Sequence, residues 1–201
     1  MILPNQLTVL RIILTPVFLF LFLQDEPLMI QISFIVFLLA AITDWYDGWL
    51  ARKFNYITEW GKFLDPLADK VLTSTAFIAL VITDILELWM VLLIILRDII
   101  VTGLRMYADN KKVTFSTSYT AKVKTFSQMF FLYYLLLFYT INTIEPFKTK
   151  YKDLLNSLLD PALIYYVMLA ITLFTVYTGI TYVLSNRKLI KQLFVNETKP
   201  N

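Results

Sequence analysis

A succession of long apolar segments constrains the fold of this chain more than any other feature. Six segments approach the length of a membrane span: residues 9–23, 28–52, 61–83, 87–108, 119–142 and 161–184. About 20 apolar residues in a helix cross the roughly 30 Å hydrocarbon core of a bilayer. Only 16% of the 201 residues are charged and 58% are hydrophobic, whereas about a quarter of a soluble domain is charged. The sequence therefore predicts an all-α integral membrane protein.

The polar breaks between these segments are too short to separate domains. We therefore expect residues 1–201 to form one domain with six transmembrane helices. Residues 1–11 lack the basic start and the small-residue cleavage site of a secretory signal peptide. They predict instead a short interfacial helix that leads into the first span.

Basic residues are distributed unevenly between the two sides of the predicted bundle. They concentrate near the N-terminus, after the second and fourth spans, and in the C-terminal tail. The opposite loops are mainly acidic, with Lys148, Lys150 and Lys152 as exceptions. Lys and Arg are enriched in cytoplasmic loops. We therefore expect a multi-pass topology with both termini on the cytoplasmic side, and contact with membrane lipids.

The chain contains no Cys and no His. Disulfides, thiolate nucleophiles, Cys-bound zinc and imidazole bases are therefore excluded. Acid–base chemistry must come from Asp, Glu, Lys or Tyr, and a bound metal must accept oxygen ligands. Such ligands favour Mg²⁺, Mn²⁺ or Ca²⁺.

Four carboxylates at helical spacing lie at the inner ends of the second and third predicted spans: Asp44, Asp47, Asp65 and Asp69. Residues three or four apart share a helix face, so two antiparallel helices would oppose two acidic faces. Clustered like charges at membrane depth are unfavourable, and two divalent ions would neutralise them. Two alternatives stay open at this point. The acids pair with nearby cations, or they line the pathway of a cation transporter; the candidate cations are Arg52, Lys53, Lys62 and Lys70.

The acids belong to a longer pattern that resembles the signature of the CDP-alcohol phosphatidyltransferases. The pattern is Asp-x-x-Asp-Gly-x-x-Ala-Arg, eight residues, then Gly-x-x-x-Asp-x-x-x-Asp. The small residues would let helix backbones or a ligand approach closely. Every defining position is filled here: Asp44, Asp47, Gly48, Ala51, Arg52, Gly61, Asp65 and Asp69.

Three flanking segments, residues 4–11, 97–105 and 118–125, are similar to the phosphatidylglycerophosphate synthase branch of that family. Related cardiolipin synthases share parts of them. The resemblance implies transfer of a phosphatidyl group from CDP-diacylglycerol to sn-glycerol 3-phosphate, with release of CMP, at an inner or plasma membrane. Sister enzymes that use inositol phosphate, serine or phosphatidylglycerol remain an alternative, and an inactive scaffold is a third, although all four acids are intact.

The same resemblance implies a role for each site residue. Mg²⁺ or Mn²⁺, expected as two ions, would be held by the four acids at a cytoplasmic site, and Asp69 would also be the general base. A homodimer is expected by resemblance, and no nucleic-acid partner is expected. The residues expected to bind CDP-diacylglycerol are Asn5, Thr8, Arg11, Gly48, Ala51, Arg52, Thr58 and Gly61.

An anionic acceptor such as glycerol 3-phosphate needs a cationic pocket of its own. The candidates lie in the fourth and fifth spans, mostly at their cytoplasmic ends: Arg97, Arg105, Lys122 and Lys124. The last three also fit the simpler role of positive-inside anchors. Arg97 lies within its span, where Asp98 is a candidate for a structural ion pair.

Overall fold

The computed structural model describes residues 3–54, 59–111 and 119–195, and these residues are helical apart from short turns, with no strand. Two short helices, α6 (Glu145–Lys150) and α7 (Lys152–Leu158), follow α5 and were not predicted. The all-α prediction is confirmed, because each apolar segment falls on one long helix. These helices are α1 (Leu3–Phe22), α2 (Pro27–Phe54), α3 (Glu59–Ile82), α4 (Leu88–Asn110), α5 (Tyr119–Ile141) and α8 (Pro161–Val195).

The N-terminal helix predicted for residues 1–11 is not a separate element. Helix α1 runs without interruption from Leu3 to Phe22, and the predicted interfacial segment forms its first turns. No glycine or proline lies between Asn5 and Thr15 to end the helix there.

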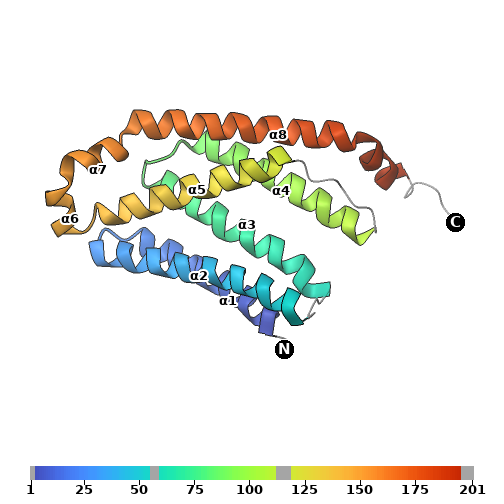
Figure 1. Cartoon of the computed structure of the whole chain (residues 1–201), viewed down its shortest axis with the longest axis horizontal. Helices are drawn as coiled ribbons and strands as arrows, with labels where there is room; N and C mark the ends of the chain where they lie inside the picture. The colour runs from blue at the N-terminus through green and yellow to red at the C-terminus, as the bar shows by residue number, and fades with distance from the viewer. Residues whose placement is uncertain (1–2, 55–58, 112–118, 196–201) are drawn as a thin grey trace.

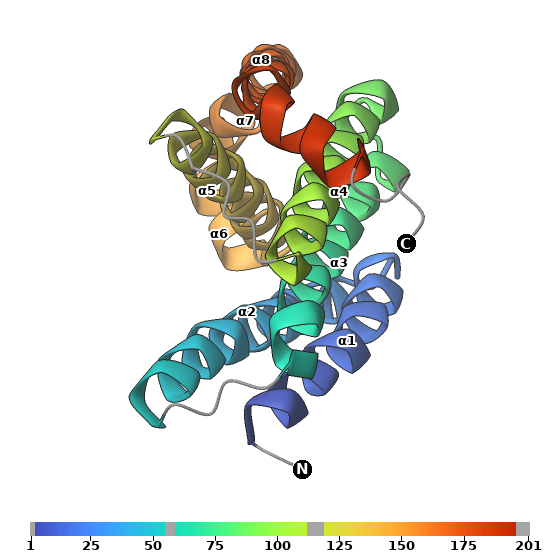
Figure 2. The same cartoon turned by 90° about the vertical axis from the view of Figure 1, so that its right-hand side faces the viewer.

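Successive long helices run in opposite directions along the long axis of the molecule (Figure 1). Both termini lie toward one end, together with the end of α2 and the start of α3. Helices α6 and α7 lie at the other end. Figure 2, a view along that axis, shows α1 and α2 on one side, α4, α5 and α8 on the other, and α3 in between. The topology therefore brings the two helices with signature acids to the end that holds both termini.

The helices are not packed in simple chain order. Helix α1 packs along both α2 and α3, whereas α2 and α3 touch only locally among the described residues. On the other side, α4 packs against α3 and α8, and α5 packs against α8 and α2. Residues of α1 and α8 are therefore in reach of the helices that carry the site.

Aromatic side chains join the α1–α2 pair to α5. The ring of Phe37 in α2 lies 5.3 Å from that of Phe18 in α1 and 5.4 Å from that of Tyr133 in α5, measured between centroids. Phe22 in α1 lies 5.3 Å from Tyr139 in α5. Tilted aromatic pairs at this separation are favourable beyond the area that they bury.

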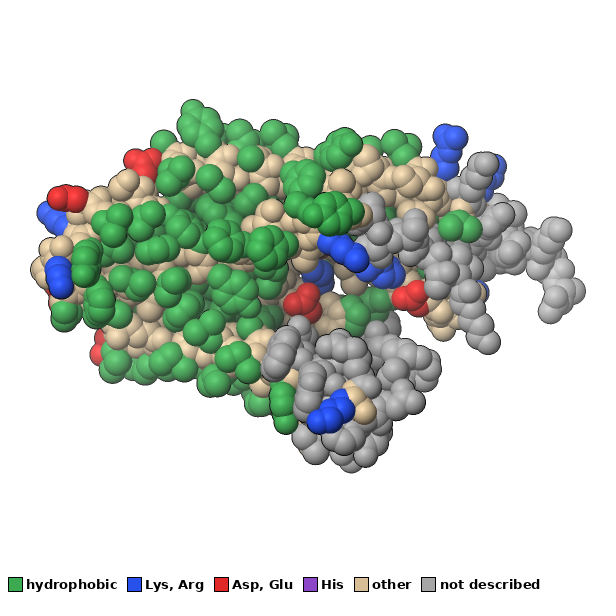
Figure 3. Space-filling model, in the orientation of Figure 1, with side chains coloured by type: hydrophobic (Ala, Val, Ile, Leu, Met, Phe, Trp, Pro, Cys, Tyr) green, Lys and Arg blue, Asp and Glu red, His purple; other side chains and the backbone are tan. Residues whose placement is uncertain are grey.

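The outer surface is rich in apolar side chains. Phe20, Phe126, Phe130, Tyr166 and Leu173 are each more than 60% exposed. Figure 3 shows apolar side chains over most of one face, and charged side chains gathered around a hollow to the right of its centre. Soluble monomers rarely expose apolar patches of more than a few hundred Å². Lipid contact would explain this surface.

By length and composition, one described helical stretch can cross a bilayer: Lys152–Ser185, which comprises α7 and most of α8. Gln6–Phe22 and Pro27–Thr43 are also apolar but shorter. The topology of six spans stays a prediction.

Candidate active site

The four signature acids fall on two helices, near the end of α2 and in the first half of α3. Asp65 and Asp69 are one turn apart on α3 and are both partly buried. Asp44 and Asp47 lie in α2, but their side chains are outside the described part of the structure. No group of three or more acidic side chains comes together among the described residues. Of the predicted four-acid cluster, the structure therefore describes only the two side chains on α3, those of Asp65 and Asp69.

Several residues predicted to bind CDP-diacylglycerol cannot be placed in the site. Thr58 is outside the described residues altogether. The side chains of five others are outside them as well, although their positions in the helices are described: Asn5, Gly48, Ala51, Arg52 and Gly61.

Helix α1 supplies a direct partner to one signature acid. Thr8 is fully buried, and its Oγ1 donates a hydrogen bond to Oδ1 of Asp65 at 2.5 Å. Arg11, three residues later on the same helix face, is also fully buried. The contact exists because α1 packs along α3, an arrangement that hydropathy alone does not indicate. It holds the Asp65 carboxylate in one orientation.

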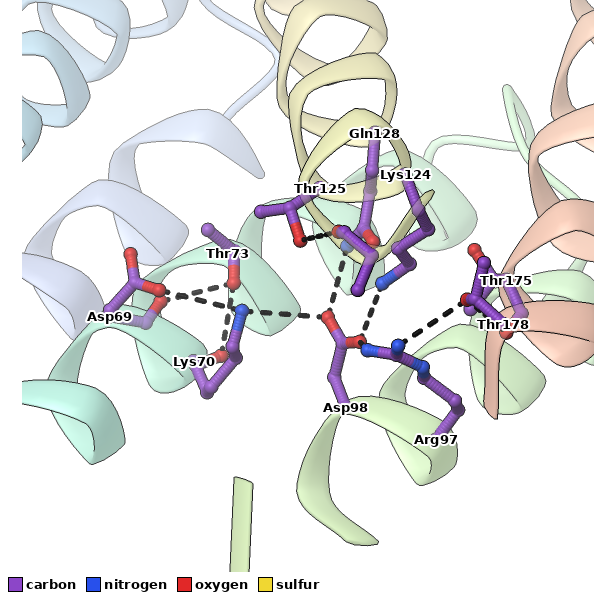
Figure 4. Close-up of polar contacts among 11 residues, drawn as sticks. Asp69, Lys70, Thr73, Arg97, Asp98, Lys124, Thr125, Gln128, Thr175 and Thr178 are labelled. Carbon is purple, nitrogen blue, oxygen red and sulfur yellow. Dashed lines mark hydrogen bonds and ion pairs between the residues drawn. The ribbon is translucent and has the colours of Figure 1, made fainter. Parts of the chain in front are cut away.

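A buried charge cluster lies next to these acids, centred on Asp98 of α4. Asp98 is 5% exposed, and its Oδ1 is 2.5 Å from Nζ of Lys124 and 3.0 Å from Nη1 of Arg97. Its Oδ2 lies 3.5 Å from Nζ of Lys70 and 3.5 Å from Nε2 of Gln128 (Figure 4). We call these five residues the Asp98 cluster. Helices α3, α4 and α5 all contribute to it.

Charge is unbalanced within the Asp98 cluster. Three cations, on Lys70, Arg97 and Lys124, face the one carboxylate of Asp98. Lys124 is fully buried, and buried charges are unfavourable unless they are paired. With Asp69, which also contacts Lys70, three cations face two carboxylates, and the remaining excess of positive charge makes this a favourable environment for an anion.

Lys70 connects the Asp98 cluster to the signature acids. Its Nζ lies 3.5 Å from Oδ2 of Asp98 and also 3.5 Å from Oδ2 of Asp69, on the opposite side (Figure 4). The Oδ2 atoms of Asp69 and Asp98 are therefore separated by no more than the sum of these two distances. The contact between Lys70 and Asp69 partly supports the alternative in which the signature acids pair with nearby cations. The same ammonium, however, also contacts Asp98.

Helix α8 completes the surroundings of Arg97. Nη2 of Arg97 donates a hydrogen bond to Oγ1 of Thr178 at 3.3 Å. A Cβ on the neighbouring Gly179 would lie 2.8 Å from Cγ of Arg97, so only glycine leaves room for this side chain. Two buried atoms here, Nε of Arg97 and Oγ1 of Thr175, have no hydrogen-bond partner among the described residues. A bound ligand or water would satisfy them.

The four cations predicted for the acceptor are placed differently from one another. The structure brings Arg97 and Lys124 together at Asp98, whereas Lys122 is exposed at the start of α5. Arg105 is partly buried and lies two turns after Asp98 on the same face of α4. Its Nε is buried without a hydrogen-bond partner in the described structure.

Sequence reasoning did not assign Lys70, Gln128, Thr178 or Gly179 to the site. A signal existed for Gln128, which follows Lys124 by four residues and so shares its helix face. Lys70 directly follows Asp69, but adjacency in a helix does not place two side chains on one face. Nothing in the local sequence marks Thr178 or Gly179.

Comparison with known proteins supports the family resemblance found in the sequence. A family model described as CDP-alcohol phosphatidyltransferase matches residues 1–186. The chain belongs to the CDP-alcohol phosphatidyltransferase family. The match covers the signature and extends through most of α8, so the prediction made from the signature is confirmed.

Curated relatives of this CDP-alcohol phosphatidyltransferase are named CDP-diacylglycerol–glycerol-3-phosphate 3-phosphatidyltransferase. The Rickettsia typhi protein is 43% identical over 135 residues, which cover 67% of this chain and 76% of the relative. The Bacillus subtilis protein is 42% identical over 147 residues, with the same two coverages. The Salmonella typhimurium protein is 41% identical over 139 residues, covering 66% and 75%.

Proposed function

We propose that this protein transfers the phosphatidyl group of CDP-diacylglycerol to sn-glycerol 3-phosphate, giving phosphatidylglycerophosphate and CMP. The family supplies the reaction type, and the names of the relatives agree with the acceptor. One structural observation carries the proposal. A cluster with an excess of positive charge lies next to Asp69, joined to it by Lys70.

The Asp98 cluster favours an acceptor that carries a phosphate monoester. Such a group has a charge of about −1.5 to −2 at neutral pH. Arg97 and Lys124 can donate to it, and the unpartnered Nε of Arg97 and Oγ1 of Thr175 offer further hydrogen bonds. Serine carries no phosphate and phosphatidylglycerol carries no phosphate monoester, so neither requires this surplus of positive charge. Inositol phosphate would fit by charge, and the names of the relatives favour glycerol 3-phosphate over it.

The residues present fit a divalent metal. The α3 half of the signature offers two carboxylates one turn apart, and Thr8 already orients one of them. Oxygen-only ligands suit Mg²⁺ or Mn²⁺. We propose that Asp44, Asp47, Asp65 and Asp69 hold two such ions. When bound, these ions would neutralise the pyrophosphate of the donor and stabilise the departing CMP.

The chain's own residues would then position and deprotonate the acceptor. Arg97 and Lys124 hold its phosphate, and Asp69 accepts the proton of the attacking hydroxyl, since the chain has no His. The hydroxyl oxygen bonds to the phosphatidyl phosphorus. The bond from that phosphorus to the bridging oxygen breaks, and CMP leaves with the electron pair. By family resemblance, Gly48 and Arg52 contact the nucleotide end of the donor.

Replacing Thr8 with Val should weaken metal binding, because Val keeps the shape of Thr but cannot hold the Asp65 carboxylate. Partners of metal ligands commonly contribute 10- to 100-fold to metal affinity. We expect the Mg²⁺ concentration for half-maximal activity to rise about 10-fold. A Mg²⁺ titration of activity measures this. Thr8→Ser should stay near wild type, as should Thr149→Val on exposed α6. An unchanged titration in Thr8→Val would show that the hydrogen bond has no role in metal binding.

Replacing Gly179 with Ala should disturb acceptor binding through Arg97. The added Cβ would lie 2.8 Å from Cγ of Arg97, close to the backbone, where the side chain cannot easily move aside. We expect the KM for glycerol 3-phosphate to rise about 10-fold, equivalent to the loss of about 1.4 kcal/mol. Gly103→Ala in α4 is the matched control, because the Cβ built there meets nothing within 4 Å beyond its chain neighbours and its own helix backbone. Equal acceptor KM values in the two variants would contradict this role of Gly179.

The proposed function is tested by CMP release from purified full-length protein. The assay supplies CDP-diacylglycerol and Mg²⁺, with and without sn-glycerol 3-phosphate. Release that requires both the metal and glycerol 3-phosphate is expected. Release only with another alcohol would change the acceptor, while no release from folded protein with any acceptor would refute the transferase proposal and favour cation transport.

We further propose that the six long helices span the inner or plasma membrane, with both termini and the site cytoplasmic, in a homodimer. The exposed apolar surface and the location of both termini at one end support this topology (Figures 1 and 3). The chain has no Cys, so single cysteines can report accessibility without background. Lys148→Cys should react with an impermeant reagent from outside the cell, and Arg187→Cys only after lysis. The reverse pattern would invert the topology.

A further inference from the structure

We propose that Lys70 is the third cation of the acceptor site and sets the separation between the acceptor phosphate and Asp69. This inference rests on the proposed function and assigns a specific contact within it. Neither the signature nor the flanking motifs point to Lys70. The assignment comes from its position between two carboxylates on different helices.

The contacts of Lys70 leave it free to bind an anion. Charge-assisted hydrogen bonds between an ammonium and a carboxylate are usually about 2.7–2.9 Å long. Both carboxylate contacts of Lys70 are 3.5 Å long, whereas Lys124 lies 2.5 Å from Asp98. An ammonium has three donors. Lys124 already uses one donor in a short bond to Asp98, whereas Lys70 makes no bond of that length and retains all its donors for a short bond to another acceptor.

Accessibility also favours Lys70. The side chain of Lys70 is 21% exposed, compared with 12% for Arg97 and 0% for Lys124. The most accessible cation of the Asp98 cluster is thus the one nearest to the signature acids. A soluble phosphorylated acceptor would meet this cation first.

The position of Lys70 matches the shape of the acceptor. Glycerol 3-phosphate is a three-carbon chain with a phosphate at one end and the reacting hydroxyl at the other. The site has a cationic cluster at Asp98 and the proposed base at Asp69, with Lys70 between them (Figure 4). A bond from Lys70 to the phosphate would hold the hydroxyl near Asp69. Lys70 therefore contributes both to acceptor binding and to its alignment.

The test compares Lys70→Met, Lys70→Arg and wild-type protein at saturating Mg²⁺. We expect Lys70→Met to raise the KM for sn-glycerol 3-phosphate at least 10-fold, while the KM for CDP-diacylglycerol changes less than twofold. Lys70→Arg, which keeps the charge, should recover part of the acceptor affinity. Lys148→Met, on exposed α6 at the other end of the molecule, should match wild type.

A second measurement isolates the contact with phosphate. Inorganic phosphate should inhibit wild-type protein competitively with glycerol 3-phosphate, and its inhibition constant should rise in Lys70→Met by a similar factor. A merely structural role would shift the KM values of both substrates together and leave the competition unchanged. An unaltered acceptor KM in active Lys70→Met would overturn the inference and leave the proposed function intact. Failure of wild-type protein to use glycerol 3-phosphate would overturn both.

If Lys70→Met does not fold, amine labelling of the wild-type protein tests whether Lys70 contacts the acceptor. Glycerol 3-phosphate should protect Lys70 from acylation, measured by mass spectrometry of the peptide, and should not protect Lys148. Equal labelling of Lys70 with and without the acceptor would overturn the assignment.

Discussion

Asp69→Asn is expected to abolish most turnover while leaving the protein folded and able to bind CDP-diacylglycerol. Asn has nearly the shape of Asp but cannot accept the proton of the attacking hydroxyl. A positioned general base accelerates a reaction by about 10²- to 10⁴-fold, so we expect the turnover rate to decrease by about 10²-fold or more. The Asp69 side chain is 36% exposed, which leaves it accessible to a substrate. The measurement is the rate of CMP release at saturating concentrations of both substrates.

The control for this prediction is Asp153→Asn, which removes an exposed carboxylate from α7 at the other end of the molecule. Its activity should equal that of wild type. Donor binding is measured separately, by the concentration of CDP-diacylglycerol that protects the protein against thermal unfolding. Wild-type turnover in Asp69→Asn would remove Asp69 from the role of base. Lost donor protection would instead indicate that Asp69 acts mainly through the metal.

The helices of this protein could be predicted because each one is a long apolar segment bounded by polar residues. Two of the predicted breaks coincide with the ends of helices: Gln24–Pro27 separates α1 from α2, which begins at Pro27, and Thr83–Asp84 lies between α3 and α4. Asp84 adopts a left-handed backbone conformation with φ of 56°, which Asp tolerates better than most residues. Helices α6 and α7 were missed because they are short and partly polar. A hydropathy pattern carries little information on elements of that length.

The neighbours of each helix could not be predicted in the same way. In lipid, helix pairs form through close packing and polar contacts and not through hydropathy, so apolar segments look alike in sequence. The packing of α1 along α3, and hence the hydrogen bond from Thr8 to Asp65, was therefore not foreseen. The same reason applies to α8, whose Thr178 and Gly179 shape the surroundings of Arg97.

The candidate site was predicted best where charge is unusual for its surroundings. Arg97 and Lys124 were predicted to bind the acceptor because they are cations in or near apolar spans. The structure places both next to the carboxylate of Asp98. Sequence alone treated Asp98 as a structural partner of Arg97. The structure shows it as the common partner of three cations from three helices, a relation that depends on tertiary packing.

Asp98→Asn should therefore have the largest effect on stability of any single change considered. It removes the only carboxylate of a cluster that holds three cations, one of which, Lys124, is fully buried. Removing one partner of a buried ion pair costs about 3–5 kcal/mol, because the other charge is left without compensation. We expect a clear fall in the thermal unfolding temperature in detergent, and a raised KM for glycerol 3-phosphate in any protein that folds. Asp109→Asn, exposed at the end of the same helix, should leave both values near wild type.

A double variant separates the two roles of the cluster. Asp98→Asn combined with Lys124→Met removes the uncompensated ammonium and fills similar volume, so we expect it to be more stable than Asp98→Asn alone. The effects of substituting such neighbouring charges on the free energy of unfolding are not additive. Acceptor affinity should not recover, because Lys124 itself is lost. If the double variant were less stable than the single one, Lys124 would stabilise the fold without Asp98. If acceptor affinity recovered with stability, the cluster would serve only to hold α3, α4 and α5 together.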